Sequence, residues 1–237
     1  MEQRKVVVLT GAGISAESGV RTFRDNGGLW EEHRVEDVAT PEAWRHDADM
    51  VWRFYQARRR QLSEVKPNEG HLSLFRFQSE VEHVTLITQN VDDLHERAGC
   101  TDVIHMHGEL RTLRCEFSHE REVRMEPSDL SDDFAYCTCC AHQSRMRPDI
   151  VWFGETPMQM SRIIEAVETC DLFVVVGSSG HVYPAAGLVN HAKHSGAHTV
   201  LVNLEQPANA EAFDEVHLGL AGELLPTLVS TWLKEFN

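Results

Sequence analysis

Four of the six cysteines in this 237-residue chain lie in one stretch, at Cys115, Cys137, Cys139 and Cys140. A secreted disulfide framework would spread its cysteines and follow a signal peptide, and the first apolar run, Val6–Leu9, is too short to be one. The cluster therefore predicts a metal site. The Cys137-x-x-Cys140 spacing is typical of a structural zinc, which takes four ligands, most often as two such pairs.

A glycine-rich turn follows the first apolar run. The segment Gly11-Ala12-Gly13-Ile14-Ser15-Ala16 fits the G-x-G-x-x-G/A pattern, in which backbone N–H groups approach a pyrophosphate at the start of a helix. Gly11 permits the tight turn, Gly13 lets a phosphate approach, and Ala16 allows close packing of the helix. The turn predicts nucleotide binding, although glycine pairs after strands also form plain turns.

The chain has no convincing counterpart of the acidic residue that binds ribose in an ordinary dehydrogenase. Glu31 and Glu32 have the expected spacing, but no second strand precedes them. Two later turns, Gly177-Ser178-Ser179 and Asn203-Leu204-Glu205, each follow a buried strand and are able to contact ribose and adenine instead. Glu205 is then a suitable acceptor for ribose hydroxyls.

The elements that position these residues alternate between strands and helices. Continuous apolar runs predict buried strands at Val6–Leu9, Val84–Thr88, Leu172–Val176 and Thr199–Val202. Helical patterns lie between them, at Glu69–Ser79, Val91–Ala98, Met160–Thr169 and Pro184–Ser195. This alternation predicts an α/β fold, a parallel sheet with helices on both faces. Residues 41–65, helical throughout, and residues 113–147, rich in charge and cysteine, interrupt it and are expected to form a smaller second lobe.

The charge balance excludes several classes of function. The chain has 22 Lys and Arg against 37 Asp and Glu, and 22 − 37 gives a net charge of −15. This argues against a nucleic-acid binder, which needs a basic surface. No run approaches the ~18 apolar residues of a membrane span. We therefore expect a cytoplasmic enzyme without a membrane or specific nucleic-acid partner, whose acidic charge suits basic protein substrates.

Four motifs together resemble one family. They are Gly11-Ala12-Gly13-Ile14-Ser15, Gly19-Val20-Arg21-Thr22-Phe23-Arg24, Thr88-Gln89-Asn90-Val91-Asp92 and His105-Met106-His107-Gly108. In this order they resemble the sirtuins, NAD-dependent protein-lysine deacylases, over most of the chain. The resemblance implies a Rossmann-type domain of residues 1–34, 76–112 and 146–237. It also implies a small lobe, made of a helical module at 35–75 and a zinc-ribbon-like module at 113–145.

The resemblance implies which residues bind NAD, a co-substrate that the family consumes. Phe23 would shield the reacting ribose carbon from water, and Asp92 would hold the nicotinamide amide. Taken alone, Phe23 would be a core anchor, and Asn90 and Asp92 would only cap a helix. The implied NAD-binding residues are Gly11, Ala12, Gly13, Ser15, Ala16, Phe23, Arg24, Trp30, Gln89, Asn90, Val91, Asp92, Gly177, Ser178, Ser179, Asn203, Leu204, Glu205 and Ala221.

Catalysis is also inferred from the resemblance. The acyl oxygen attacks the ribose carbon as nicotinamide leaves, and the products are free lysine and O-acyl-ADP-ribose. In the second step, a ribose hydroxyl attacks the intermediate formed by the first. This step needs a base that is neutral near pH 7, which histidine supplies. His107 stands at the family's base position, with Asn90 and Asp92 as the other catalytic residues. The alternative for His107, one of 14 histidines, is a core residue.

Tyr55 and Arg58 are three residues apart and so share one helix face. On their own they suggest a half-buried tyrosine and a solvated basic run at 58–60. Tyr-x-x-Arg is, however, the mark of class III sirtuins, in which the pair binds an acyl group that ends in a carboxylate. This implies removal of succinyl, malonyl or glutaryl groups from lysine, with acetyl accepted as well. Ala39 would leave room for the longer acyl chain.

The substrate-binding residues implied by the resemblance are Val151 and Phe153, which would flank the lysine. Their backbone would pair with the substrate peptide as an added strand, with little preference for peptide sequence. We expect a monomer.

The zinc ligands implied by the family are Cys115, Cys137 and Cys140. Ser118 stands where the family has its second cysteine, so Cys139 or His119 is expected to complete the set, or zinc is weak or absent. Two other functions remain open. One is a sirtuin-type mono-ADP-ribosyl transferase, which would not need a pocket for a carboxylate. The other is a non-catalytic Rossmann nucleotide-binding module, which would not need the His-x-His-Gly motif.

Overall fold

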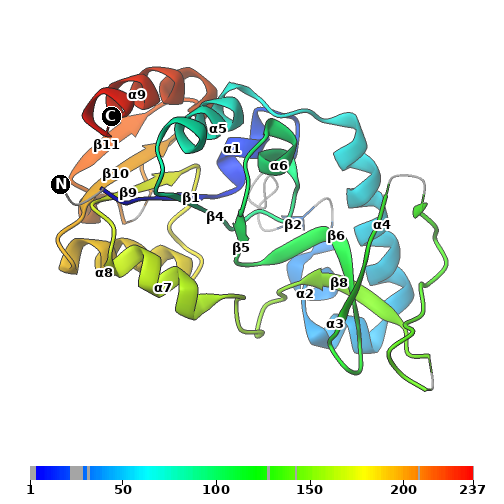
Figure 1. The fold of residues 1–237 in the computed structure, drawn as a ribbon. Helices are drawn as coiled ribbons and strands as arrows, with labels where there is room; N and C mark the ends of the chain where they lie inside the picture. The colour runs from blue at the N-terminus through cyan, green and yellow to red at the C-terminus, as the bar shows by residue number, and fades with distance from the viewer. Residues whose placement is uncertain are drawn as a thin grey trace.

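The computed structural model describes residues 4–21, 29–30, 33–126, 129–141, 143–207 and 209–236, with only the backbone of 29–30 and 121–124. Figure 1 shows a larger body of sheet and helices, which carries both ends of the chain, and a smaller lobe beside it. The predicted α/β fold with a second lobe is confirmed.

The larger body is built on a six-stranded sheet in the order β11-β10-β9-β1-β4-β5, with all neighbours parallel. Its strands are β1 (Val6–Thr10), β4 (Val84–Thr88), β5 (Ile104–His105), β9 (Leu172–Val176), β10 (His198–Asn203) and β11 (Glu215–Leu218). The four central strands are the four that were predicted. They are continuous apolar runs because both of their faces are covered. The edge strands were missed because β5 has two residues and β11 is largely exposed.

Helices cover both faces of this sheet (Figure 1). One face carries α5 (Glu69–Glu80) and α9 (Ala221–Phe236), and the other carries α7 (Met160–Glu168) and α8 (Leu188–His194). The helix predicted from Val91 begins later, as α6 (Leu94–Ala98). The Asp92 carboxylate accepts the N–H of Leu94 at 3.2 Å, so the residues before it turn and do not join the helix.

The smaller lobe combines the two segments that interrupt the alternation. Residues 41–65 form two helices instead of one, because the side chains of Thr40 and Asp47 each cap a helix start. These helices are α3 (Pro41–His46) and α4 (Ala48–Glu64). They share one buried core with an antiparallel sheet of β7 (Arg121–Arg124), β6 (Gly108–Cys115) and β8 (Met146–Ile150).

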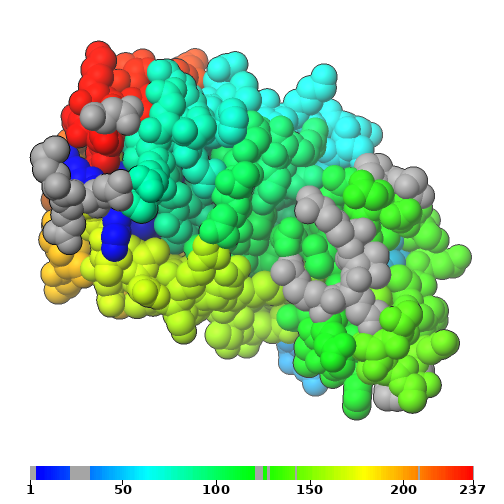
Figure 2. Space-filling view, in the orientation of Figure 1, coloured from blue at the N-terminus to red at the C-terminus, as the bar shows by residue number. Residues whose placement is uncertain are grey.

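The smaller lobe lies at one end of the molecule and the C-terminal helix at the other. Figure 2 shows the green segments of the smaller lobe at the end opposite to the red helix α9. The domain boundaries given above stay a prediction.

Candidate functional site

The loops after β1 and β9 touch at the carboxyl edge of the sheet. Gly13, in α1 (Ala12–Ala16), donates its N–H to the carbonyl oxygen of Gly177 at 2.9 Å. A Cβ atom on Gly11 would lie 2.8 Å from that oxygen, and one on Gly13 would lie 2.7 Å from the Gly177 Cα. Both positions therefore require glycine because the two loops pack directly together.

Two further loops complete this edge. After β4, Gln89 donates Nε2 to Ser178 Oγ at 3.0 Å. After β10, Asn203 donates Nδ2 to the carbonyl oxygen of Glu205 at 2.7 Å. The predicted NAD-binding segments thus gather outside the carboxyl ends of the strands, where sheets of this type bind ligands. Glycines, amides and hydroxyls in this arrangement fit a dinucleotide.

A buried polar cluster lies behind the glycine turn. Asn90 donates Nδ2 to Ser15 Oγ at 3.1 Å, and the Ser15 hydroxyl donates to Asp92 Oδ2 at 2.9 Å. Burial raises the pKa of Asp92, although the hydrogen bonds from the Ser15 hydroxyl and the Leu94 N–H oppose the shift. The Nε2 atom of His71 lies 3.5 Å from Ser15 Oγ, and the sequence motifs did not predict this neighbour. His71 forms a capping box with Asn68, but the sequence has histidine where this pattern normally has Glu or Gln, so no sequence signal pointed to it.

The two histidines of the His-x-His-Gly motif have different surroundings. His105 is buried, with Nε2 2.7 Å from Glu96 Oε1. Burial alone would lower the pKa of His105, but the hydrogen bond and charge of Glu96, together with the Glu109 charge and the Asn90 carbonyl, outweigh it and raise the pKa. His107 is half-buried, with Nδ1 3.0 Å from the carbonyl oxygen of Gln89, and burial lowers its pKa despite that bond. His107 is therefore neutral near pH 7, as a base requires.

A partly open pocket connects this edge of the sheet to helix α4. Val91 and Asp92 line it from the sheet, and Arg58 lines it from α4. The half-buried guanidinium of Arg58 lies 5.4 Å from the centre of the Phe54 ring. The predicted acyl-binding arginine and the predicted nicotinamide-binding aspartate thus share one cavity.

The arginine run on α4 is not a uniformly solvated surface. Arg59 is buried and donates Nε to the carbonyl oxygen of Leu110 at 2.6 Å. Arg60 is exposed and pairs with Asp132 at 2.6 Å. The interpretation of residues 58–60 as a solvated run therefore holds only for Arg60.

Tyr55 lies deeper than Arg58 and is fully buried. Its hydroxyl oxygen accepts a hydrogen bond from Trp152 Nε1 at 3.0 Å. Burial raises the pKa of Tyr55, so the phenol keeps its proton at any physiological pH.

The segment around Trp152 also contacts the backbone of His107, the predicted base. The N–H groups of Val151 and Phe153 donate to the carbonyl oxygens of His107 and Ala39, both at 2.9 Å. The predicted substrate-binding segment therefore lies between His107, the predicted base, and Tyr55 of the predicted acyl pair.

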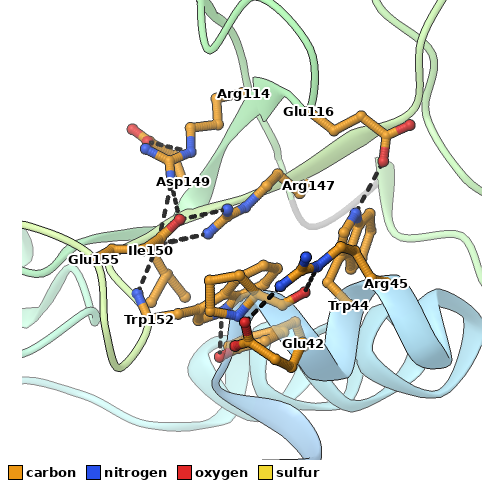
Figure 3. A network of polar contacts seen from close by, with 12 residues as sticks. Glu42, Trp44, Arg45, Arg114, Glu116, Arg147, Asp149, Ile150, Trp152 and Glu155 are labelled. Carbon is orange, nitrogen blue, oxygen red and sulfur yellow. Dashed lines mark hydrogen bonds and ion pairs between the residues drawn. The ribbon is translucent and has the colours of Figure 1, made fainter.

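An ion-pair network that the sequence did not reveal supports this segment (Figure 3). Both terminal nitrogens of Arg147 donate to Glu155, at 2.8 and 2.9 Å, and Arg114 adds bonds at 3.2 Å. Glu155 also accepts the backbone N–H of Trp152 at 2.9 Å. Burial would raise the pKa of Glu155, but these bonds outweigh it and lower the pKa.

The cysteine cluster offers four thiol ligands. The Sγ atoms of Cys115, Cys137, Cys139 and Cys140 all lie within 4.8 Å of one another. Cys139 thus takes the place that Ser118 leaves, and the Ser118 hydroxyl lies 3.0 Å from the Cys139 Sγ. Although burial opposes ionisation, hydrogen bonds from Ser118 and Phe117 lower the pKa of Cys115 to about 6. A set of four thiolates fits structural zinc.

The structure does not describe the side chains of three residues that were predicted to bind NAD. Phe23 and Arg24 lie outside the described residues, and only the backbone of Trp30 is described.

The fold and the site together define a Rossmann-type NAD-binding protein with a cysteine-bearing lobe. The chain belongs to the Sir2 family, whose model matches residues 11–184. The predicted membership of the sirtuins is thereby confirmed.

Several relatives and solved structures are similar over almost the whole chain. An "NAD-dependent protein deacylase" of Shewanella oneidensis is 52% identical, over 96% of this chain and 94% of its own. One from Escherichia coli K12 is 51% identical, over 99% and 84%. A crystal structure of a Sir2 homologue–NAD complex has a TM-score of 0.88 at 37% identity, over 100% and 92%. A Sir2–p53 peptide–NAD+ structure has a TM-score of 0.81 at 30% identity, over 98% and 94%.

In the part of the chain that the structure describes, no helix is long and apolar enough to cross a bilayer.

Proposed function

We propose that this protein is an NAD-dependent protein-lysine deacylase that removes succinyl or malonyl groups, and also acetyl groups, from lysine side chains. The observation that carries the proposal is the cavity shared by Asp92 and Arg58. An acyl group entering it meets the cation on one side and the predicted nicotinamide site on the other. The relatives named above support NAD-dependent deacylation, and the Tyr55/Arg58 pair supports the acidic acyl group.

The loops at the carboxyl edge of the sheet would hold NAD, which would supply a ribose carbon from which nicotinamide leaves. The glycine turn would face the pyrophosphate, and Asn203 and Glu205 the adenosine ribose. Asn90 and Asp92 are held in place by Ser15, so their remaining polar atoms have fixed positions.

His107 would act as the base toward a ribose hydroxyl. A carbonyl oxygen only accepts hydrogen bonds, so Nδ1 of His107 carries a proton toward Gln89. In the neutral ring, Nε2 is then the atom that takes up a proton. The lowered pKa keeps that atom unprotonated near pH 7.

Arg58 and Tyr55 would recognise the acyl carboxylate. A guanidinium pairs with a carboxylate through two parallel hydrogen bonds, and a protonated phenol adds a third donor. Acetyl lysine lacks the carboxylate and loses only these contacts.

Binding of the substrate peptide along Val151–Phe153 would use the carbonyl oxygens of this segment. The N–H groups of Val151 and Phe153 already donate within the protein. If the substrate peptide binds as an added strand, its remaining backbone hydrogen bonds therefore need partners from another segment of the protein. Zinc on the four cysteines would stabilise the smaller lobe and take no part in the chemistry.

Mass spectrometry of a succinyl-lysine peptide, with and without NAD, tests this proposal. We expect NAD-dependent loss of the succinyl group, with one nicotinamide and one O-succinyl-ADP-ribose formed for each lysine released. Transfer of ADP-ribose to the peptide, or NAD binding without nicotinamide release, would replace the proposal by one of the two alternatives.

A further inference from the structure

Trp152 is enclosed between an ion pair and the tyrosine of the acyl pair. Its side chain is 2% exposed. The guanidinium carbon of Arg147 lies 3.4 Å from the centre of the Trp152 ring, and Arg147 is itself held by Glu155. Because Glu155 also binds the backbone N–H of Trp152, one carboxylate fixes both the backbone and the ring of this residue (Figure 3).

The hydrogen bond from Trp152 to Tyr55 has only one possible direction. An indole N–H is a donor and never an acceptor. The Tyr55 oxygen therefore accepts at 3.0 Å, and its own proton points to a different partner. Without this bond, the indole would no longer restrict the direction of the Tyr55 O–H.

We propose that Trp152 is a specificity-determining positioning residue, which orients the Tyr55 hydroxyl toward the acyl carboxylate and so increases the preference for acidic acyl groups. The inference rests on the proposed function, because it needs Tyr55 to meet that carboxylate. Trp152 acts through Tyr55 and does not touch the reacting atoms.

The variant Trp152→Phe tests this, because it removes the N–H and keeps a flat ring for Arg147. The measured quantity is the ratio of kcat/KM for succinyl-lysine and acetyl-lysine forms of one peptide. We expect the ratio to fall roughly three- to tenfold, the effect of one neutral hydrogen bond. Trp152→His, which restores a ring N–H, is expected to recover part of the ratio.

A matched control is available in the same lobe. Trp52 is 1% exposed and donates its indole N–H to the carbonyl oxygen of Ser131 at 3.3 Å. Trp52→Phe makes the same chemical change but leaves the hydrogen bond from Trp152 to Tyr55 in place, so the ratio should stay at the wild-type value. Thermal unfolding of each variant reports any general loss of stability.

Tyr55→Phe separates this inference from the proposed function. If Trp152 acts through the hydroxyl, adding Trp152→Phe to Tyr55→Phe leaves the ratio unchanged. A ratio that falls in Tyr55→Phe but not in Trp152→Phe, or that rises in Trp152→Phe, would overturn the role of Trp152 alone. A wild-type protein without succinyl preference, and no change in Tyr55→Phe, would overturn the acyl assignment and this inference together.

Discussion

The Nδ1 atom of His107 lies 3.0 Å from the carbonyl oxygen of Gln89, and this contact determines which ring nitrogen can act as a base. It also links His107, the proposed base, to the loop after β4, whose Gln89 side chain binds Ser178 in the loop after β9. His107, the proposed base, is therefore positioned by the segment that precedes Asn90 and Asp92.

The pH dependence of deacylation should reflect the lowered pKa of His107. Burial disfavours the charged ring, so the neutral, active form persists to lower pH than for a free histidine. We expect kcat/KM to rise with pH and to reach half its plateau below the ordinary histidine pKa of about 6.5. Peptide deacylation rates between pH 5 and 8 measure this, and a midpoint above pH 7 would contradict it.

The substitution His107→Ala should remove turnover and leave NAD binding intact. Loss of a general base costs on the order of 10²- to 10⁴-fold in rate. Deacylation assays and calorimetric titration with NAD measure the two effects. His191→Ala serves as the control, because that exposed histidine on α8 pairs with Glu168. Comparable activity losses in both variants would argue against the assigned base.

Much of the fold and part of this site follow from the sequence, for identifiable reasons. The four central strands are apolar at nearly every position because helices cover both faces, so they could be found. The strand β11 lies at an edge and exposes Glu215 and Val216, so it has no such run.

The chemistry of individual side chains was harder to predict. His105 and His107 are two residues apart, and only the fold shows that one meets Glu96. Arg147 and Glu155 meet around a tight turn that leaves no periodic signal. The choice of Cys139 over His119 also depends on loop geometry, because spacing permits both.

The zinc ligands can be tested by two variants at neighbouring atoms. Cys139→Ser removes one of four clustered thiols and should lower both the zinc content and the Tm. Ser118→Ala, which removes only the hydroxyl beside that thiol, should keep both values near wild type. Atomic absorption and thermal unfolding provide the measurements. Full zinc content in Cys139→Ser would exclude it as a ligand.

The stability of the protein should fall on acidification because of His71. Burial lowers the pKa of His71 to about 4, so the folded state binds a proton less readily than the unfolded state. Below pH 6.5 the unfolded chain binds more protons, and the free energy of unfolding falls by about 1.4 kcal/mol per pH unit from this group. The contribution is complete near pH 4.

Urea unfolding of wild type and His71→Asn at pH 7 and pH 5 tests this assignment. The asparagine variant lacks the titrating group, so its stability should depend less on pH. Equal pH dependence in both proteins would show that other groups dominate.

The most direct test of the account is a competition between succinyl-lysine and acetyl-lysine forms of one peptide, with NAD, in wild type and Arg58→Met. Loss of a charged hydrogen bond predicts that the variant loses roughly 10- to 150-fold in relative kcat/KM for the succinyl peptide. Equal losses on both peptides would show that Arg58 supports the fold and does not recognise the acyl group.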